Sequence, residues 1–162
     1  MKTLILIRHA KSDWNSPTGD YDRQLAESGK RDAKAISSKA YELLPDHYIV
    51  WSSPANRAQQ TATIFTATVF YPFEDIIFKE ELYTFDIKAL EKAIKSCDNL
   101  HVCLIVFGHN EAITDFVNKF GDIFIDNVPT SGFVSITFDT NEWQSIQKGK
   151  TMKVIFPRDL KS

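Results

Sequence analysis

The feature that most limits the possible folds is a short, continuous apolar run near the N-terminus, residues 3–7, with the sequence Thr-Leu-Ile-Leu-Ile. A strand with one face in water would alternate apolar and polar side chains, and a buried helix would need a longer run. A short run without alternation is typical of a strand that is covered on both faces. The sequence therefore predicts a sheet with a layer of structure on each side.

Further along the chain, short apolar segments alternate with segments in which apolar residues recur every three or four positions, the spacing of a helix that buries one face. We expect helices at residues 29–44, 54–65, 87–97 and 110–120. We expect further strands at residues 48–51, 75–79 and 101–107. The last segments, 133–138, 143–146 and 152–156, alternate apolar with polar residues, which is typical of antiparallel strands at a sheet edge.

Residues at the ends of these segments indicate where helices begin and stop. Ser52 and Ser53, followed by Pro54, are predicted to supply an N-cap and a first-turn proline for the second helix. Asp86 is predicted to cap the third helix, and Pro45 to end the first.

Strands that alternate with helices are typical of an α/β fold with right-handed crossover connections. We therefore predict a three-layer α/β/α sandwich with a mostly parallel central sheet and an antiparallel edge. The length of 162 residues fits one domain with a sizeable core, and no repeat, low-complexity tract or linker divides the chain. We expect a single domain over residues 1–162.

Charge and hydropathy exclude several classes of function. Lys and Arg total 19 against 21 Asp and Glu, a formal charge of -2, so we expect no binding to nucleic acid. The N-terminal apolar run is too short for a signal peptide, and no segment reaches the roughly 20 apolar residues of a transmembrane helix. We expect a cytoplasmic protein without a membrane partner. Cys97 and Cys103 form no CxxC motif and are expected in the core.

Four basic side chains are expected at one edge of the sheet. Arg8 and His9 follow the first strand, His109 follows a later strand, and Arg57 lies in the first turn of the predicted second helix. Ligands of α/β proteins bind beyond the carboxyl ends of the strands, so these side chains are predicted to meet there. Arginine matches phosphate oxygens and keeps its charge, and helix N-termini favour anions. The group predicts a pocket for a phosphoryl group.

Four short motifs, in the same order along the chain, resemble those of one protein family. Residues 8–15, Arg-His-Ala-Lys-Ser-Asp-Trp-Asn, are similar to a signature in which a strand ends in Arg-His-Gly and a polar stretch follows. Residues 25–29 resemble the family's segment before its first helix. Residues 52–62 are similar to the family's second conserved block, and Gly-His-Asn at 108–110 to its third. From its N-terminus to about Asn110, the chain resembles the histidine phosphatase superfamily, also called the phosphoglycerate-mutase-like family.

This resemblance implies a phosphotransfer reaction. A neutral His9 would attack phosphorus, and water would then hydrolyse the phosphohistidine intermediate. The residues implied to bind the phosphoryl oxygens and stabilise the transition state are Arg8, Arg57 and His109. Ser12 and Asn15 match positions that give hydrogen bonds to the phosphoryl group in relatives, so we expect them to bind substrate. The resemblance implies no metal and no cofactor.

The form Ala10-Lys11-Ser12 within the first motif is similar to the small SixA-type branch of the superfamily, the phosphohistidine phosphatases. Other branches carry a general-acid carboxylate, and Glu81, next to Glu80, lies in the corresponding region, which makes Glu81 the candidate acid. An alkoxide leaving group needs such a proton, whereas imidazole, with an ordinary pKa of about 6.5, leaves more easily. We therefore favour a phosphatase that acts on phosphohistidine in a protein, such as a phosphorelay component.

Three other functions remain open. The first is a phosphomonoesterase for small phosphorylated metabolites, with Glu81 or Glu80 as the acid; a mutase is less favoured because the short chain leaves no room for segments that close over a substrate. The second is a metallohydrolase with His9, His109 and Asp13 as ligands, although their spacing fits no standard metal motif. The third is a module that binds phosphorylated partners without turnover.

Overall fold

Six strands form one sheet in the computed structural model, which describes residues 1–15 and 17–161. The strands are β1 (Lys2–Arg8), β2 (Ile49–Ser52), β3 (Ile77–Phe78), β4 (Cys103–Gly108), β5 (Phe133–Phe138) and β6 (Lys150–Ile155). Their order across the sheet is β3-β2-β4-β1-β5-β6. The first four strands in this order are parallel, and β5 pairs antiparallel with both β1 and β6. The predicted mostly parallel sheet with an antiparallel edge is confirmed.

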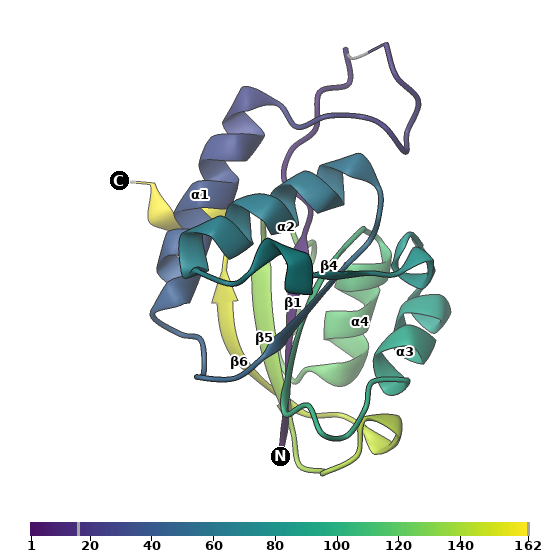
Figure 1. Cartoon of the computed structure of the whole chain (residues 1–162). Helices are drawn as coiled ribbons and strands as arrows, with labels where there is room; N and C mark the ends of the chain where they lie inside the picture. Colours follow the sequence, from purple (N-terminus) through teal and green to yellow (C-terminus); the bar gives the residue numbers. More distant parts are fainter. Residues whose placement is uncertain (16, 162) are drawn as a thin grey trace.

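Helices cover both faces of this sheet. They are α1 (Glu27–Tyr41), α2 (Asn56–Val69), α3 (Ile87–Lys95) and α4 (Ala112–Phe120). Helices α1 and α2 lie on one side of the sheet and α3 and α4 on the other (Figure 1). Leu4 and Leu6 of β1 belong to the core with α3 and α4, whereas Ile5 and Ile7 belong to the core with α1 and α2. This burial on both faces explains the continuous apolar run and confirms the three-layer sandwich.

Short 3-10 helices connect several of these elements. Their bounds are Phe73–Asp75, Glu80–Leu82, Trp143–Ser145 and Pro157–Leu160. The third of them corrects a prediction, because residues 143–146 do not form a strand. Trp143 and Ile146 are both buried, and side chains three positions apart lie on the same side of a 3-10 turn. The indole N–H of Trp143 donates to the backbone oxygen of His101 at 2.7 Å, which holds the turn against the sheet.

The start of α2 also differs from the prediction. Ala55, rather than Ser52 or Ser53, is the N-cap, and Pro54 lies outside the helix. The hydroxyl of Ser53 accepts a hydrogen bond from the amide of Ala55 at 3.2 Å, which makes a tight turn between β2 and α2. Ser53 is therefore part of the connection at the carboxyl edge of the sheet, not part of the helix.

The other predicted helix boundaries are closer to those observed. Asp86 caps α3, since its carboxylate accepts a hydrogen bond from the amide three residues ahead at 3.2 Å. Helix α1 ends at Tyr41, four residues before Pro45, where the amide of Leu43 donates to the oxygen of Ala40 at 2.8 Å and tightens the last turn. None of the helices in the described part of the chain is long and apolar enough to cross a membrane.

The carboxyl ends of β1, β4 and β2 lie side by side. Arg8 of β1 is aligned with Gly108 of β4, and Ser52 of β2 is aligned with Phe107 of β4. The residues that directly follow these strands therefore meet at one edge. The loop after β1 lies at this same end of the molecule, next to the first turn of α2 (Figure 1).

Candidate active site

His9, the residue directly after β1, is the first member of a polar cluster at this edge. Its Nδ1 lies 2.7 Å from the backbone oxygen of Ala10, and because a carbonyl only accepts hydrogen bonds, Nδ1 carries the proton. The lone pair is then on Nε2, toward which Arg57 donates its Nε–H at 3.4 Å. The amide of His9 donates to the oxygen of Gly108 at 3.0 Å, which fixes the residue relative to β4. Nε2 is thus the atom that can attack an electrophile.

Burial keeps the imidazole of His9 neutral. The residue is only 7% exposed, and loss of hydration, reinforced by the positive charges of Arg57 and Arg8, lowers the pKa of His9 to about 3. The hydrogen bond with Ala10 acts in the opposite direction but is outweighed. At neutral pH, Nε2 is therefore unprotonated and available as a nucleophile.

Arg57 lies in the first turn of α2 and is 2% exposed although it is charged. Its Nη1 donates to the backbone oxygen of Asp20 at 2.6 Å, and its Nη2 lies 3.2 Å from the carboxylate of the same residue. A cation in the first turn of a helix opposes the helix dipole, so the position is unfavourable without an anion nearby. Asp20 supplies that anion, while the Nε–H of Arg57 is directed at His9.

Arg8 is held by the segment that leads into β5. Its Nη1 donates to the oxygen of Val128 at 3.0 Å, and its Nε is buried without a partner among residues 1–15 and 17–161. The amide of Ser131 donates to the oxygens of both Arg8 and His9, at 3.0 and 3.2 Å, and Ser131 adopts a left-handed φ of 60° to do so. A buried donor without a partner is uncommon in proteins, so the Nε–H of Arg8 has hydrogen-bonding capacity that a ligand could use.

His109 lies after β4, beside His9. Its Nε2 is 2.8 Å from the hydroxyl of Ser53, and its ring centroid is 5.2 Å from that of His9. The rings of Tyr83 and Phe85 pack against it, with centroids 5.3 and 5.6 Å away. Burial, reinforced by neighbouring His9, lowers the pKa of His109 to about 3. A neutral ring keeps one N–H, which can donate to a phosphoryl oxygen.

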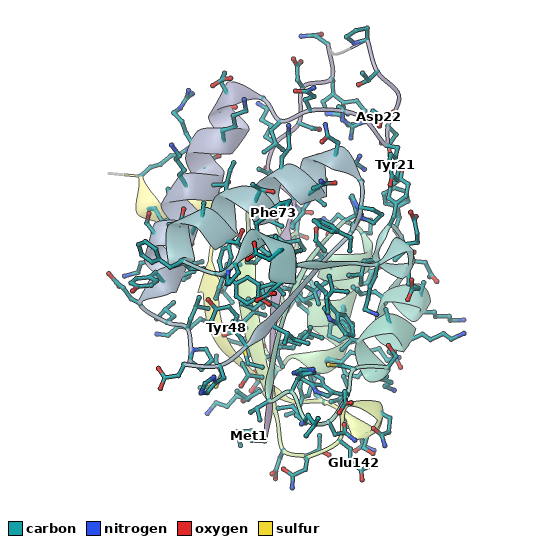
Figure 2. The ribbon with its side chains drawn as sticks, viewed as in Figure 1. Met1, Tyr21, Asp22, Tyr48, Phe73 and Glu142 are labelled. Atoms are coloured by element: carbon teal, nitrogen blue, oxygen red, sulfur yellow. The ribbon has the colours of Figure 1, made fainter. Side chains whose placement is uncertain are left out.

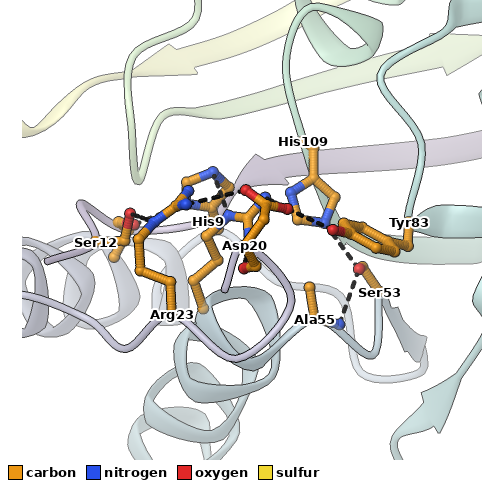
Figure 3. A network of polar contacts seen from close by, with 10 residues as sticks. His9, Ser12, Asp20, Arg23, Ser53, Ala55, Tyr83 and His109 are labelled. Atoms are coloured by element: carbon orange, nitrogen blue, oxygen red, sulfur yellow. Dashed lines mark hydrogen bonds and ion pairs between the residues drawn. The ribbon is translucent and has the colours of Figure 1, made fainter. Parts of the chain in front are cut away.

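Sequence reasoning did not single out Asp20, Arg23 and Tyr83, which complete this network. Nη1 of Arg23 lies 2.9 Å from the carboxylate of Asp20, and its Nε donates to the hydroxyl of Ser12 at 2.7 Å. The hydroxyl of Tyr83 donates to the same carboxylate. Asp20 therefore lies between Arg23 and Tyr83 (Figure 3). The sequence gives one indication that Asp20 and Arg23 belong to the site, because both lie in the polar segment between the motifs at residues 8–15 and 25–29. It does not say which way their side chains point.

A cavity of about 230 Å³ lies at this edge of the sheet. The structure brings five predicted site residues together in its wall, namely Arg8, His9, Ser12, Arg57 and His109. The volume is below the range of about 300–1,000 Å³ typical of pockets for drug-sized ligands, which suits a compact anion. In the part of the chain that the structure describes, no group of three or more His, Cys, Asp or Glu side chains is placed to hold a metal ion.

Two predicted residues lie outside this wall. Asn15 is exposed, and its backbone amide donates to the carboxylate of Asp13 at 2.9 Å. Glu81 is exposed in the 3-10 turn Glu80–Leu82. A substrate-binding role for Asn15 and an acid role for Glu81 therefore stay predictions.

Histidines and arginines that meet at the carboxyl edge of an α/β sheet form a site suited to a phosphoryl group. The family model of the histidine phosphatase superfamily (branch 1) matches residues 4–99, which is more than half of the chain. The chain belongs to this superfamily.

Curated relatives match its N-terminal part. Phosphoserine phosphatase 1 of Hydrogenobacter thermophilus is 45% identical over 67 residues, which are 38% of this chain and 30% of that protein. The 2,3-bisphosphoglycerate-dependent phosphoglycerate mutase of Bartonella tribocorum is 41% identical over 64 residues, 38% of this chain and 31% of that protein. The matched region thus spans less than a third of either relative.

Solved structures match nearly the whole chain. The protein histidine phosphatase SixA in complex with tungstate has a TM-score of 0.80 at 19% identity, with 98% of this chain and 99% of that chain covered. SixA from Nakamurella multipartitia has a TM-score of 0.79 at 21% identity, with 96% of each chain covered. This chain therefore has the fold of the SixA proteins.

Proposed function

We propose that this protein is a phosphatase in which Nε2 of His9 is the nucleophile. The single observation that carries the proposal is the state of His9: its Nδ1 donates to Ala10, its ring is neutral, and its Nε2 lies against the Nε–H of Arg57. A nitrogen with a lone pair beside a fixed guanidinium suits attack on phosphorus, because the cation binds the oxygens on which charge accumulates.

The reaction proceeds in two displacements. In the first, Nε2 of His9 forms a bond to phosphorus while the bond to the leaving group breaks, and the leaving group takes the electron pair. In the second, water attacks phosphorus and the P–N bond to His9 breaks, which releases phosphate and restores the neutral ring. Arg57, Arg8 and His109 donate hydrogen bonds to the phosphoryl oxygens in both steps.

The substrate that the site favours is phosphohistidine in a protein. Asp20 is the carboxylate in the cavity wall, and hydrogen bonds from Tyr83 and the arginines, together with the charge of Arg57, overcome burial and lower its pKa to about 2, so it holds no proton to donate. Glu81 lies outside the wall. A leaving group that needs no strong acid is therefore favoured, and imidazole is such a group. Similarity to the SixA fold supports the same substrate class.

The second candidate is hydrolysis of small phosphomonoesters. It is favoured by the identity of 45% with Phosphoserine phosphatase 1 over the N-terminal motifs. In this case Glu81 would act as the acid after a movement that brings it to the cavity.

A comparison of two substrates tests the proposal. We expect kcat/KM for a phosphohistidine peptide to exceed that for phenyl phosphate, and both activities to disappear in His9→Ala. His47→Ala, which removes an exposed histidine outside the cavity, is the matched control and should keep full activity. Activity that survives in His9→Ala would overturn the proposed nucleophile. A preference for phenyl phosphate, with loss of ester turnover in Glu81→Gln, would favour the second candidate.

A further inference from the structure

A negative group stands at the mouth of this cationic cavity. Both carboxylate oxygens of Asp20 are engaged, one by Nη1 of Arg23 at 2.9 Å and the other by Nη2 of Arg57 at 3.2 Å and by the hydroxyl of Tyr83. Its backbone oxygen accepts from Nη1 of Arg57 at 2.6 Å. The side chain is nevertheless 45% exposed and belongs to the cavity wall, so a molecule that enters the cavity can reach it.

This placement is unfavourable for binding a phosphoryl dianion alone. Like charges close together repel each other, and the carboxylate competes with the phosphoryl oxygens for the guanidinium of Arg57. The Asp20 carboxylate compensates the charge of Arg57, but this pairing alone does not explain why the carboxylate is part of the cavity wall, since backbone oxygens hold Arg8 and also contact Nη1 of Arg57. The charge of Asp20 becomes favourable when the part of the substrate that remains at the entrance is positive.

Two exposed aromatic side chains line the same cavity as this carboxylate. Phe85 is 53% exposed, lines the cavity and packs against His109 with centroids 5.6 Å apart. Trp14 is 76% exposed and also lines the cavity, with the guanidinium of Arg23 3.6 Å from its ring centroid. Exposed aromatic faces bind flat rings and cations. The entrance thus combines one carboxylate with two aromatic faces.

We propose that Asp20, Phe85 and Trp14 form a leaving-group subsite for a protonated imidazole, which selects phosphohistidine over phosphoesters. This inference rests on the proposed function and names the residues that set its substrate class. The carboxylate pairs with the N–H of the leaving ring, and the aromatic faces pack against that ring. Asp20 is here a specificity-determining residue that contacts the substrate.

The subsite assists the first displacement through the state of the leaving group. In an N-phosphoimidazole the nitrogen away from phosphorus can carry a proton. When it does, the P–N bond breaks with its electron pair going to the ring, and a neutral imidazole leaves while Nε2 of His9 takes the phosphoryl group. Without that proton the ring would leave as a poor, anionic group. A carboxylate beside the distal N–H favours the protonated form.

The test is Asp20→Asn with two substrates, a phosphohistidine peptide and phenyl phosphate, whose leaving group carries no positive charge. We expect kcat/KM for the peptide to fall at least about tenfold further than kcat/KM for phenyl phosphate, because the interaction with a positively charged leaving group is lost in one case only. Asp22→Asn is the matched control, since Asp22 is an exposed acid on the same loop that does not line the cavity (Figure 2). It should leave the ratio of the two values unchanged.

A parallel fall for both substrates would overturn the inference, because it would make Asp20 a positioning residue for Arg57 and Arg23. A parallel rise would also overturn it, because Asp20 would then merely block the anion site. Phe85→Leu, compared with Phe124→Leu outside the cavity, provides a second variant and should lower the peptide value selectively. Absence of turnover in the wild-type protein would instead contradict the proposed function, so the two failures are distinguishable.

Discussion

Lowering the pH from 8 to 5 should destabilise the folded protein, because His9 and His109 are buried in their neutral forms. The pKa of each is about 3 in the folded state, whereas an unfolded chain has a histidine pKa of about 6.5. Between these values the unfolded state binds more protons, so stability is fully present above pH 6.5 and is lost as the pH falls. At pH 5 each histidine lowers the free energy of unfolding by about 2 kcal/mol relative to pH 8, and the pair by about 4 kcal/mol.

Urea unfolding followed by tryptophan fluorescence at the two pH values measures this difference. In His9→Gln the pH-dependent loss should shrink from about 4 to about 2 kcal/mol or less, since one of the two groups is gone and His9 no longer lowers the pKa of its neighbour His109. His47→Gln, at an exposed position, should keep the loss of the wild-type protein. Equal losses in the wild type and His9→Gln would refute the claim that burial holds His9 neutral.

Three further substitutions test the packing and the anion site. Gly29→Ala should lower stability by about 1–3 kcal/mol despite the helix preference of alanine, because its Cβ would lie 2.2 Å from a backbone oxygen; Gly19→Ala, with nothing within 4 Å, is the control in thermal denaturation. Arg57→Lys should weaken tungstate binding by about tenfold or more in titration calorimetry, and unchanged affinity would contradict its role. Ser53→Ala should lower kcat by about tenfold with little change in KM, because His109 loses the partner of Nε2; an effect on KM alone would argue against this.

The fold could be predicted from the local pattern of apolar residues, because a strand covered by helices on both faces has apolar residues at successive positions. The run 3–7 is apolar without alternation since Leu4 and Ile5 face different helical layers, and both are buried. The strand predicted at residues 143–146 was wrong, because two apolar side chains three positions apart do not distinguish a short strand from a tight turn. The N-cap of α2 was misplaced because Ser53 uses its hydroxyl for a turn and for His109.

The two histidines of the site could be predicted because each directly follows a strand. Parallel strands bring their carboxyl ends together, so His9 and His109 could be placed side by side without knowing any loop. Asp20 and Arg23 could not be placed in this way, because their loop is positioned by tertiary contacts such as the hydrogen bond from Asn56 to Tyr21. Such contacts join residues 35 positions apart and leave no local pattern.

In the proposed reaction His9 becomes phosphorylated during turnover, so this intermediate should be possible to trap. The protein would be mixed with a labelled phosphohistidine peptide, quenched in alkali within milliseconds, digested and analysed by mass spectrometry. We expect phosphate on Nε2 of His9 in the wild-type protein, and none on the corresponding peptide of His9→Ala. Phosphate released without any labelled protein, or label on a residue other than His9, would contradict it.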